Sequence, residues 1–373
     1  MAIDTLGANA LASNSVTTAK IAADAVTSAK IPAGAVVASD VADGSVTTAK
    51  LADNAVTSAK ALNLGRRNIL INGAFQHWQR GTSFSTNVYG SDRWKFYAPG
   101  GHAYARSTDT PDSPNNFEFS ASVGGSGDAT GLTQFVESKN ANHIPSSGTT
   151  KVILSFYLKH TTNSGSNKIT SVVGTMDSAD NSGASTNRSV QNHNTTTSWA
   201  RYTHEMTGAD LTAAVTNGLV VTIKHNGSGT TAFLLTGCQL EINETVTDFE
   251  RRSFAEELRD CQRYYFHTYR QGIAIGSTGA DNGAALSRIY SAVTNHHNFT
   301  VIYPQHMRAT PSITYYSING TVDRVSFLGS DYSHDTNVSI TATYELGERG
   351  INGISIGAGD QSIGGHVIAN AEL

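Results

Sequence analysis

Histidine and cysteine side chains are the residues of this chain best suited to metal or redox chemistry. His296, His297 and His306 lie close together in the sequence and carry imidazole groups of the kind that bind divalent metals. No acidic or thiol side chain stands at a metal-ligand spacing from them, so we predict that they pack at a surface or between chains. Cys238 and Cys261 are too few for a disulfide framework or a structural zinc quartet. The sequence therefore predicts no bound metal and no cofactor.

Motifs for catalysis are also missing from the sequence. It contains no G-x-x-x-x-G-K-[ST] loop of the kind that cradles a phosphate. A glycoside hydrolase would need two carboxylates about 5–9.5 Å apart, and none of the 30 acidic residues is marked by a motif. No pattern places a base beside Cys261, which we predict to be a small buried apolar residue. We predict that the protein is not an enzyme.

Aromatic and histidine side chains near the C-terminus are candidates for binding neutral sugars. Residues 271–373 carry eight acidic side chains, four arginines and no lysine, which accounts for the whole net charge of −4. Attraction of an anionic polymer would favour a basic surface, so neutral sugars are the better match. The same charge balance argues against a nucleic-acid partner. The candidate contacts are Tyr290, His296, His297, Tyr315, Tyr316 and Tyr332.

The composition predicts that mainly β-structure positions these residues. Charged residues make up 15% of the chain, and there are 35 glycines against 7 prolines, which is typical of strands joined by turns. No apolar run approaches the roughly 20 residues that span a bilayer. Residues 1–4 lack the basic and apolar regions of a signal peptide. We therefore predict a soluble protein made in the cytoplasm, without membrane insertion.

A decapeptide repeat occupies residues 11–60. Each of its five blocks has an aliphatic residue at the first and sixth positions, with a turn signal between them. The Thr-Thr/Ser-Ala-Lys stretch that ends most blocks predicts a single helical turn. A period of ten excludes a heptad coiled coil. The aliphatic positions are Leu11, Val16, Ile21, Val26, Ile31, Val36, Val41, Val46, Leu51 and Val56.

Energetics indicate that one copy of this repeat cannot order itself. Ordering ten residues costs on the order of 15 kcal/mol, whereas burying two aliphatic side chains and some alanine surface returns roughly 5–8 kcal/mol. We therefore predict that residues 11–65 form the thin stalk of a homotrimer with the aliphatic rows at its core. A disordered linker and a threonine-studded ice-binding solenoid are the alternatives, and an ion bound on the trimer axis stays open. A linker would not need periodic aliphatic rows.

Residues 66–251 read as an antiparallel, jelly-roll-like β-sandwich. Trp94 and Phe75 are expected in its core, with sugar stacking as the alternative role for Trp78 and Trp94. Gly73 is expected to supply a positive φ, and Asp92–Arg93 to form an ion pair or cap a loop. The predicted strands are 69–71, 117–119, 132–136, 152–158, 170–173, 201–204, 219–224 and 233–240.

A helical neck, residues 252–270, and a C-terminal β-sandwich tip, residues 271–373, follow. Ser253 and Glu256 fit a capping box, and apolar side chains then recur at spacings of three and four, so we predict one long helix over 253–267. The strands predicted in the tip are 272–276, 287–293, 299–303, 312–318, 325–328, 338–344, 353–357 and 365–370.

Several motifs resemble those of one protein family. The segments 67–75, 78–84 and 91–94 resemble the start of a domain that is common in bacteriophage tail fibres, and the segments that begin at 239, 249 and 257 resemble its end. The decapeptide repeat is similar to the stalks of such fibres. In that family the domain is similar to carbohydrate-binding-module sandwiches. Residues 303–313 look like the Phe-Pro-x-x-Met-Arg-x-x-Pro pattern of fibre tips, with Tyr303 in place of Phe. The other matching segments are 67–75, 78–84, 91–94, 239–242, 249–252 and 257–265.

The resemblance implies an elongated homotrimeric tail fibre, made in the host cytoplasm and located in the virion. Residues 1–10 would attach it to phage tail proteins. The tip would bind a host surface polysaccharide or lipopolysaccharide without catalysis, and multivalency would raise the strength of adsorption. A structural adaptor between tail and fibre segments and a polysaccharide-degrading tailspike are the alternative functions.

Overall fold

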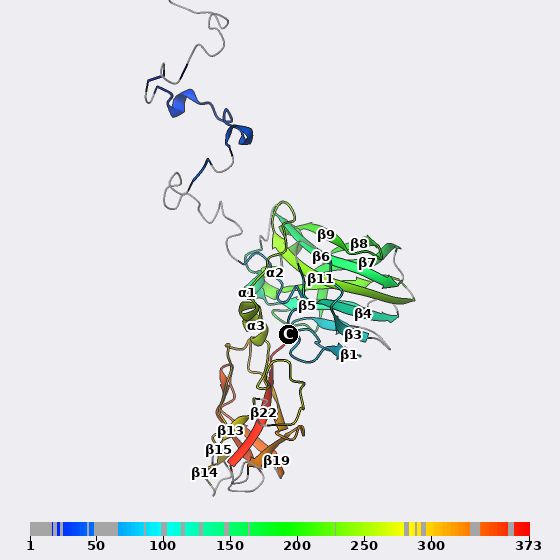
Figure 1. Ribbon diagram of the computed structural model, residues 1–373, viewed down its shortest axis with the longest axis vertical. Helices are drawn as coiled ribbons and strands as arrows, with labels where there is room; N and C mark the ends of the chain where they lie inside the picture. The colour runs from blue at the N-terminus through cyan, green and yellow to red at the C-terminus, as the bar shows by residue number, and fades with distance from the viewer. Residues whose placement is uncertain are drawn as a thin grey trace, which may run out of the picture. The chain divides into compact units, whose positions relative to one another are not determined.

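A computed structural model gives the fold of the chain (Figure 1). The chain divides into two units, Met1–Gly65 and Arg66–Leu373, and each is described by itself. The structure describes residues 17, 21–22, 25–42, 45–47, 66–85, 87–97, 103–112, 116–126, 130–144, 149–162, 165–227, 229–279, 283–287, 289–291, 296–328, 336–356 and 362–373.

Tight turns recur with a period of ten in the described part of the repeat. A hydrogen bond from the backbone N–H of Ala25 to the carbonyl of Ala22 (3.1 Å) closes one turn, and equivalent bonds recur ten and twenty residues further along. Short 3₁₀ turns form η2 (Ser28–Lys30) and η3 (Ala38–Asp40) at the ends of two consecutive blocks. The single helical turn predicted for the Thr-Ser-Ala-Lys stretch is therefore confirmed at η2, and η3 shows the same turn in a block that ends in Val-Ala-Ser-Asp instead.

The aliphatic rows are exposed in this unit. A single chain leaves these apolar side chains without a core, as the energetic argument anticipates. The predicted core positions Leu11, Val16, Leu51 and Val56, and the predicted attachment segment 1–10, lie outside the described residues. Between 42% and 58% of the side-chain surface is exposed at Ile21, Val26, Ile31, Val36, Val41 and Val46.

Two antiparallel sheets pack as a β-sandwich in the first part of the second unit (Figure 1). Neighbours in the six-stranded sheet are, in order, β1 (Ser83–Phe84), β3 (Ala103–Ser107), β4 (Ser120–Ser126), β11 (Thr230–Ile242), β6 (Lys151–Thr162) and β9 (Ala200–Thr207). Those of the five-stranded sheet are β2 (Lys95–Tyr97), β5 (Gly131–Val136), β10 (Leu219–His225), β7 (Gly165–Met176) and β8 (Ser185–Thr195). Short helical elements join strands at α1 (Ser138–Ala141), η5 (Gly208–Leu211) and α2 (Ala214–Asn217).

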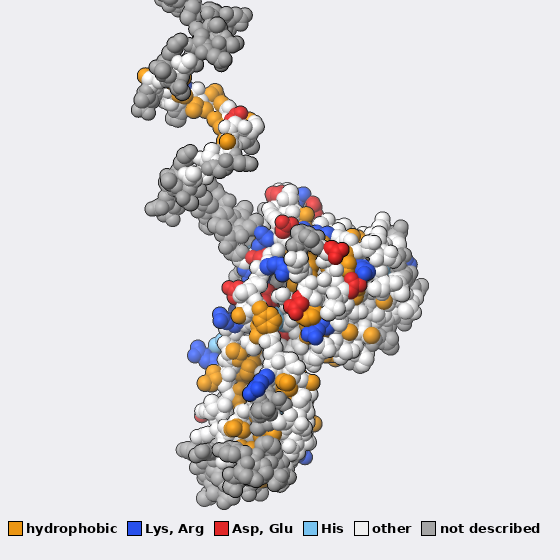
Figure 2. All heavy atoms as spheres, viewed as in Figure 1, with side chains coloured by type: hydrophobic (Ala, Val, Ile, Leu, Met, Phe, Trp, Pro, Cys, Tyr) orange, Lys and Arg blue, Asp and Glu red, His pale blue; other side chains and the backbone are white. Residues whose placement is uncertain are grey.

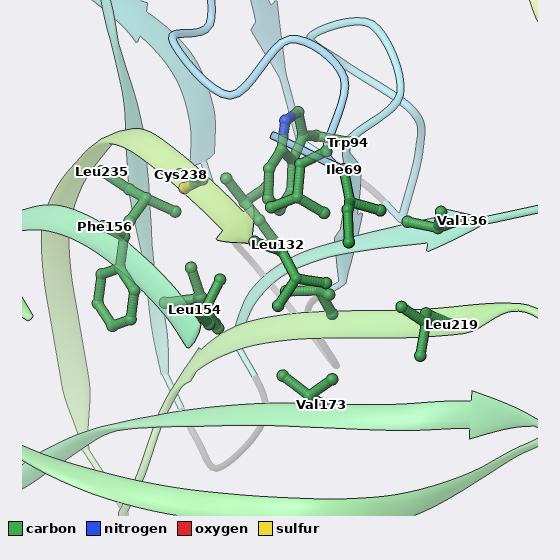
Figure 3. Close-up of a cluster of buried hydrophobic side chains, with 14 of the residues drawn as sticks. Ile69, Trp94, Leu132, Val136, Leu154, Phe156, Val173, Leu219, Leu235 and Cys238 are labelled. Carbon is green, nitrogen blue, oxygen red and sulfur yellow. The ribbon is translucent and has the colours of Figure 1, made fainter. Parts of the chain in front are cut away.

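The core of the sandwich lies between these sheets. Figure 3 shows side chains from both sheets converging, among them Leu132 from β5, Leu154 and Phe156 from β6, and Leu219 from β10. The indole of Trp94 joins them from the loop before β2 and is fully buried. Alternation of inward and outward side chains along the strands supplies this layer from both sides.

Six of the eight strands predicted for the sandwich are present. The prediction at 69–71 is wrong, because the side-chain amide of Gln134 accepts from the backbone N–H of Ile71 and donates to its carbonyl, each at 2.8 Å. The prediction at 117–119 is also wrong, since β4 begins at Ser120. Strand β8 was missed, because its exposed edge sequence is almost entirely polar.

The C-terminal domain is a second, antiparallel β domain. Strand β19 pairs with both β18 and β21, so hydrogen bonding runs without interruption through a nine-stranded sheet rather than two separate ones. Neighbours along its main path are β12 (Tyr265–His267), β22 (Ser362–Asn370), β18 (Arg324–Leu328), β19 (Asn337–Tyr344), β21 (Gly353–Ile356), β15 (His296–His297) and β14 (Ile289–Ser291). In addition, β13 (Ala285–Ser287) and β17 (Ser312–Ser317) pair with β22, and β16 (Val301–Ile302) pairs with β20 (Gly350–Ile351).

The predicted helix is present but shorter than expected. Helix α3 (Phe254–Gln262) begins with the predicted capping box, in which Ser253 and Glu256 exchange hydrogen bonds between side chain and backbone. The last five predicted residues are not helical, because Tyr265–His267 form β12 against β22. The strand predicted at 272–276 is wrong as well, since this segment turns at two glycines with positive φ. No helix in the described part of the chain is long and apolar enough to cross a membrane.

Gly73 lies where the first loop of the sandwich meets β11. The backbone N–H of Cys238 donates to the carbonyl of Gly73 (2.9 Å), and a Cβ at position 73 would overlap the carbonyl oxygen of Cys238. The predicted positive φ belongs instead to Asn72 (+56°) and Phe75 (+53°). Close backbone approach, and not a left-handed conformation, is therefore what requires glycine here.

We expect Gly73→Ala to lower the free energy of unfolding by about 2 kcal/mol, because the added methyl group forces β11 and the loop apart. The matched control is Gly347→Ala, where an added Cβ would meet nothing within 4 Å, and a change below about 0.5 kcal/mol is expected. Urea unfolding of both variants measures the difference. Equal stability of the two variants would contradict the close-approach argument.

Candidate ligand-binding cleft

A cleft of about 380 Å³ opens in the second unit where the sandwich, α3 and the C-terminal domain meet. The described side chains that line it are mainly amide, aromatic and hydroxyl groups, with no carboxylate among them. A volume of this size accommodates a small-molecule ligand or a few residues of a polymer. The lining residues are Gln76, His77, Trp78, Gln79, Gly81, Thr82, Arg106, Leu258, Gln262, His267, Tyr269, Gln271, Gly272, Ile273 and Ala274.

One wall of the cleft is a loop held in shape by Asn72. The amide nitrogen of Asn72 donates to the carbonyls of His77 (2.9 Å) and Asp92 (3.0 Å), and its amide oxygen accepts from the backbone N–H of His77 (3.1 Å). The indole N–H of Trp78 donates to the carbonyl of Phe75 (2.6 Å). These bonds fix the loop backbone independently of any ligand.

Helix α3 supplies the second wall and is tied to the same loop. Glu257 accepts a hydrogen bond from the backbone N–H of Asn72 and lies 3.5 Å from the guanidinium of Arg252, counted between charged atoms. Leu258 and Gln262, one helical turn apart on α3, line the cleft. The contacts of Glu257 with Asn72 and Arg252 thus tie to the loop the helix that carries the two cleft residues.

The third wall is the chain that leaves β12. The two ring nitrogens of His267 each lie 3.1 Å from a carbonyl oxygen, one of Tyr269 and one of Gln79 in the sandwich. A neutral imidazole has one N–H and donates to one of these carbonyls at a time. The ring of Tyr269 stacks on that of His366, with 3.8 Å between centroids and 10° between planes. Buried ring contacts therefore hold the wall against the C-terminal sheet.

A buried ion network joins the two β domains beside the cleft. The guanidinium of Arg80 lies 3.3 Å from the carboxylate of Asp92 and 3.0 Å from that of Glu372, and it also covers the ring of Tyr265. Arg93 pairs with the second oxygen of Glu372. Asp92 and Arg93 are thus both in ion pairs, but with different partners from those predicted. The carboxylate of Glu372 links the C-terminal strand to the sandwich.

Three glutamines present unused amide groups to the cleft. Gln76 and Gln262 are half-buried and Gln271 is exposed. Within the part of the chain that the structure describes, none of their amides has a hydrogen-bond partner. The amide of Gln79, in contrast, donates to Asp92 (2.9 Å) and to the carbonyl of Tyr265 (3.1 Å). An amide offers both donors and an acceptor, so the three can pair with hydroxyl groups of a ligand.

Burial lowers the pKa of both histidines of the cleft, which favours the neutral imidazole. Burial lowers the pKa of His77 to about 4. Burial also lowers the pKa of His267, although its hydrogen bonds with the backbone carbonyls of Gln79 and Tyr269 oppose this shift. On the face shown in Figure 2, charged side chains gather over the sandwich and few acidic ones lie over the C-terminal domain. The cleft is therefore a polar site with little formal charge.

The two tryptophans considered for sugar stacking do not offer a ring face. Trp94 is fully buried, and its indole N–H donates to the carbonyl of Asn72 (3.0 Å), so the predicted core role is confirmed and the stacking role is wrong. Trp78 lines the cleft but is only 9% exposed and packs against Tyr104. A sugar ring would need far more exposed indole than this, so stacking on Trp78 is also wrong in this structure.

Two of the predicted receptor contacts are buried. His297 is 2% exposed and Tyr315 is 6% exposed, and the hydroxyl of Tyr315 is paired with that of Thr343 (2.8 Å). Their assignment as surface contacts is therefore wrong, because alternating residues of strands in this sheet face the core. The thiol of Cys261 is likewise buried, as predicted, and burial raises its pKa.

The remaining predicted contacts lie outside the cleft or outside the described residues. His296 and Tyr316 are half-buried, and the ring of Tyr316 lies 6.3 Å from that of the cleft residue Tyr269. The side chain of Tyr290 and all of Tyr332 fall outside the described residues. Among the described residues, no three His, Cys, Asp or Glu side chains form a group that could hold a metal ion.

The cleft residues were missed because glutamine was not treated as a binding residue. Gln79 and Gln262 each lie inside a matching motif, and Gln76 lies between two of them. The position of these glutamines next to or near buried aromatic residues was the one sequence feature that could have indicated a binding role. Arg106 and Gln271 stand in segments without a motif, and no pattern marked them.

No family model matches the chain, and no curated protein matches it. Among solved structures, the chain is similar to the enzymatically active domain of tailspike protein 4 of bacteriophage CBA120 (13% identity, 47% of this chain, 21% of that chain, TM-score 0.30). It is also similar to the CBM22-1 xylan-binding domain of Paenibacillus barcinonensis Xyn10C (15% identity, 44% of this chain, 94% of that chain, TM-score 0.30). A third similar structure is the C-terminal family 22 carbohydrate-binding module of Clostridium thermocellum Xyn10B (14% identity, 45% of this chain, 98% of that chain, TM-score 0.30). Likenesses at this TM-score carry no argument about ligand or activity.

We expect Glu372→Gln to lower the free energy of unfolding by about 3 kcal/mol, because it leaves two buried guanidinium groups with one fewer carboxylate. Glu348→Gln is the matched control, since Glu348 pairs with His306 at the surface (3.0 Å); an exposed pair of this kind contributes less than about 1 kcal/mol. Denaturant unfolding at pH 7 checks both values. A Glu372→Gln protein as stable as the control variant would show that the network does not hold the domains together.

Proposed function

We propose that the protein is a subunit of a homotrimeric bacteriophage tail fibre that binds a host surface glycan without catalysis. In this proposal the N-terminal repeat forms the shared stalk and attaches to tail proteins of the virion. The second unit projects outward and binds the glycan in the cleft. Three clefts on one stalk raise the strength of adsorption through effective concentration.

The observation that carries the proposed ligand class is the set of unpaired amides in the cleft. Sugars present many hydroxyl groups, each both donor and acceptor, and an amide matches this pattern. Gln76, Gln262 and Gln271 offer such groups from three different segments, while Leu258 and Ile273 add apolar surface. A ligand pocket of this composition binds through convergent polar groups on an apolar wall.

The absence of carboxylates from the described cleft lining supports binding in preference to hydrolysis. Glycoside hydrolysis generally uses a pair of carboxyl groups flanking the bond to be broken. Asp92, which belongs to the ion network beside the cleft and does not line it, is buried and already paired with Arg80 and Gln79. The proposed role is therefore attachment.

The exposed aliphatic rows of the repeat support the trimer. Ile21, Val26 and Ile31 are about half-exposed in one chain, and packing several chains around an axis would remove this surface from water. The small residues at the turns allow a close approach between chains. The resemblance of the repeat to tail-fibre stalks supports the same arrangement.

Binding to a glycan array tests the cleft. We expect the double variant Gln76→Ala/Gln262→Ala to lose about 10-fold or more in affinity for glycans that the wild-type chain binds, since each lost hydrogen bond costs about 0.5–1.5 kcal/mol. Gln305→Ala removes a glutamine that does not line the cleft and should bind as the wild type does. Unchanged binding by the double variant would refute the cleft as the site, and release of reducing ends from a bound polysaccharide would refute attachment without catalysis.

Light scattering tests the stalk. The full chain is expected to show three times the chain mass of 39.4 kDa, and a chain that begins at residue 61 is expected to show a lower mass because the aliphatic rows are lost. A full-length chain that is monomeric at micromolar concentration would contradict the trimer.

A further inference from the structure

Arg106 differs from the rest of the cleft in its charge. It is exposed on β3 and lines the cleft, and its backbone N–H donates to the carbonyl of Thr82 (2.9 Å), another lining residue. Burial lowers the pKa of both His77 and His267, which favours their neutral forms. A guanidinium stays protonated under all ordinary conditions. Arg106 therefore carries the one formal positive charge among the described residues of the lining.

The guanidinium of Arg106 is held in place but not neutralised. Its central carbon lies 4.4 Å from the centroid of the Phe119 ring, a cation–π distance. Stacking of this kind uses a face of the planar group and leaves its in-plane N–H donors available. Within the described residues, Arg106 forms no ion pair, whereas Arg80 and Arg93 nearby are both paired with Glu372.

An oriented, unpaired guanidinium in an otherwise neutral polar cleft has a clear chemical complement. Carboxylate and phosphate groups accept two parallel N–H bonds from arginine, and no carboxylate stands among the described residues of the lining to compete for it. The amides of Gln76, Gln262 and Gln271 remain for hydroxyl groups. The complement of the whole cleft is thus a ligand with many hydroxyls and one anionic group.

We propose that the cleft binds an acidic glycan, with Arg106 contacting its carboxylate or phosphate group and the glutamine amides contacting its hydroxyls. This inference rests on the proposed glycan-binding function and specifies the class of glycan. It also revises the expectation of neutral sugars, which was based on the charge of residues 271–373 as a whole. That balance does not describe the cleft, because Arg106 comes from the sandwich and none of the described acidic residues of 271–373 (Asp323, Glu345, Glu348 and Glu372) lines it.

The test uses the full chain and pairs of oligosaccharides that differ only in the anionic group. One pair is a hexuronic acid oligomer and its carboxyl-reduced form, and the other is a phosphorylated oligosaccharide and its dephosphorylated form. The wild-type chain is expected to bind at least one acidic member about 10- to 100-fold more tightly than its neutral partner. Which pair shows this preference identifies the anionic group. The preference should weaken as salt is raised from 0.05 to roughly 0.5 M.

The variant Arg106→Gln is expected to abolish this preference while changing affinity for the neutral partner by less than about threefold. Arg106→Lys keeps the charge but not the planar fork, so an intermediate preference is expected. Arg349→Gln removes an exposed arginine that does not line the cleft and controls for net charge. Thermal melting and near-ultraviolet circular dichroism establish that each variant is folded.

Each outcome distinguishes this inference from the proposed function on which it rests. Equal wild-type affinity for the acidic and neutral members of both pairs would overturn the inference and leave glycan binding intact. Equal loss of affinity for both members in Arg106→Gln would show a contact that does not select for charge, which also overturns it. Failure of the wild-type chain to bind any glycan would overturn the proposed function and the inference together.

Discussion

Arg93 is almost completely buried, and a guanidinium remains buried only where oxygen acceptors surround it. Here the acceptors come from both β domains, the carboxylate of Glu372 from the end of the C-terminal domain and the carbonyl of Phe135 from the sandwich. The ring of Tyr264 covers the same group at 3.5 Å from its centroid. Arg80 repeats the arrangement with Asp92, Glu372 and Tyr265. Moving the domains apart would take the Glu372 carboxylate away from both guanidinium groups. The network therefore fixes how the two domains meet.

The cleft follows from that constraint. Its walls belong to three segments far apart in the sequence, and the residues beside the ion network are the ones that line it. Gln79 shows the connection most directly, because its amide bonds to Asp92 in the network and to the carbonyl of Tyr265 in β12. A site built in this way is formed before the ligand arrives, which reduces the entropy lost on binding.

Local patterns predicted the local parts of the fold. The apolar alternation at 152–158 predicted β6, the Ser253–Glu256 capping box predicted the start of α3, and the ten-residue period predicted turns that recur at the same block positions. Where a longer-range partner decided the outcome, the sequence was insufficient. Tyr265 continues the spacing of three and four between apolar side chains that predicted the helix. Residues Tyr265–His267 nevertheless form a strand, because they pair with β22.

The site depended even more on long-range structure. Gln76, Gln262 and Arg106 are ordinary polar residues in sequence, and only the meeting of two domains makes them neighbours around one cavity. Aromatic candidates such as Tyr315 were chosen by residue type, but strand alternation turned them toward the core. The net charge of residues 271–373 was similarly a poor predictor of the ligand's charge. Screening by salt limits the charges that act on a ligand to those close to the binding site.

Hydrogen–deuterium exchange of the full chain, with and without a bound oligosaccharide, tests the central claim that this cleft is the ligand site. We expect slower exchange in the segments 76–82, 258–262 and 269–274, with the outer strand β8 unchanged. Protection confined to β8, or to the surface around His296 and Tyr344, would place the ligand elsewhere and contradict the account.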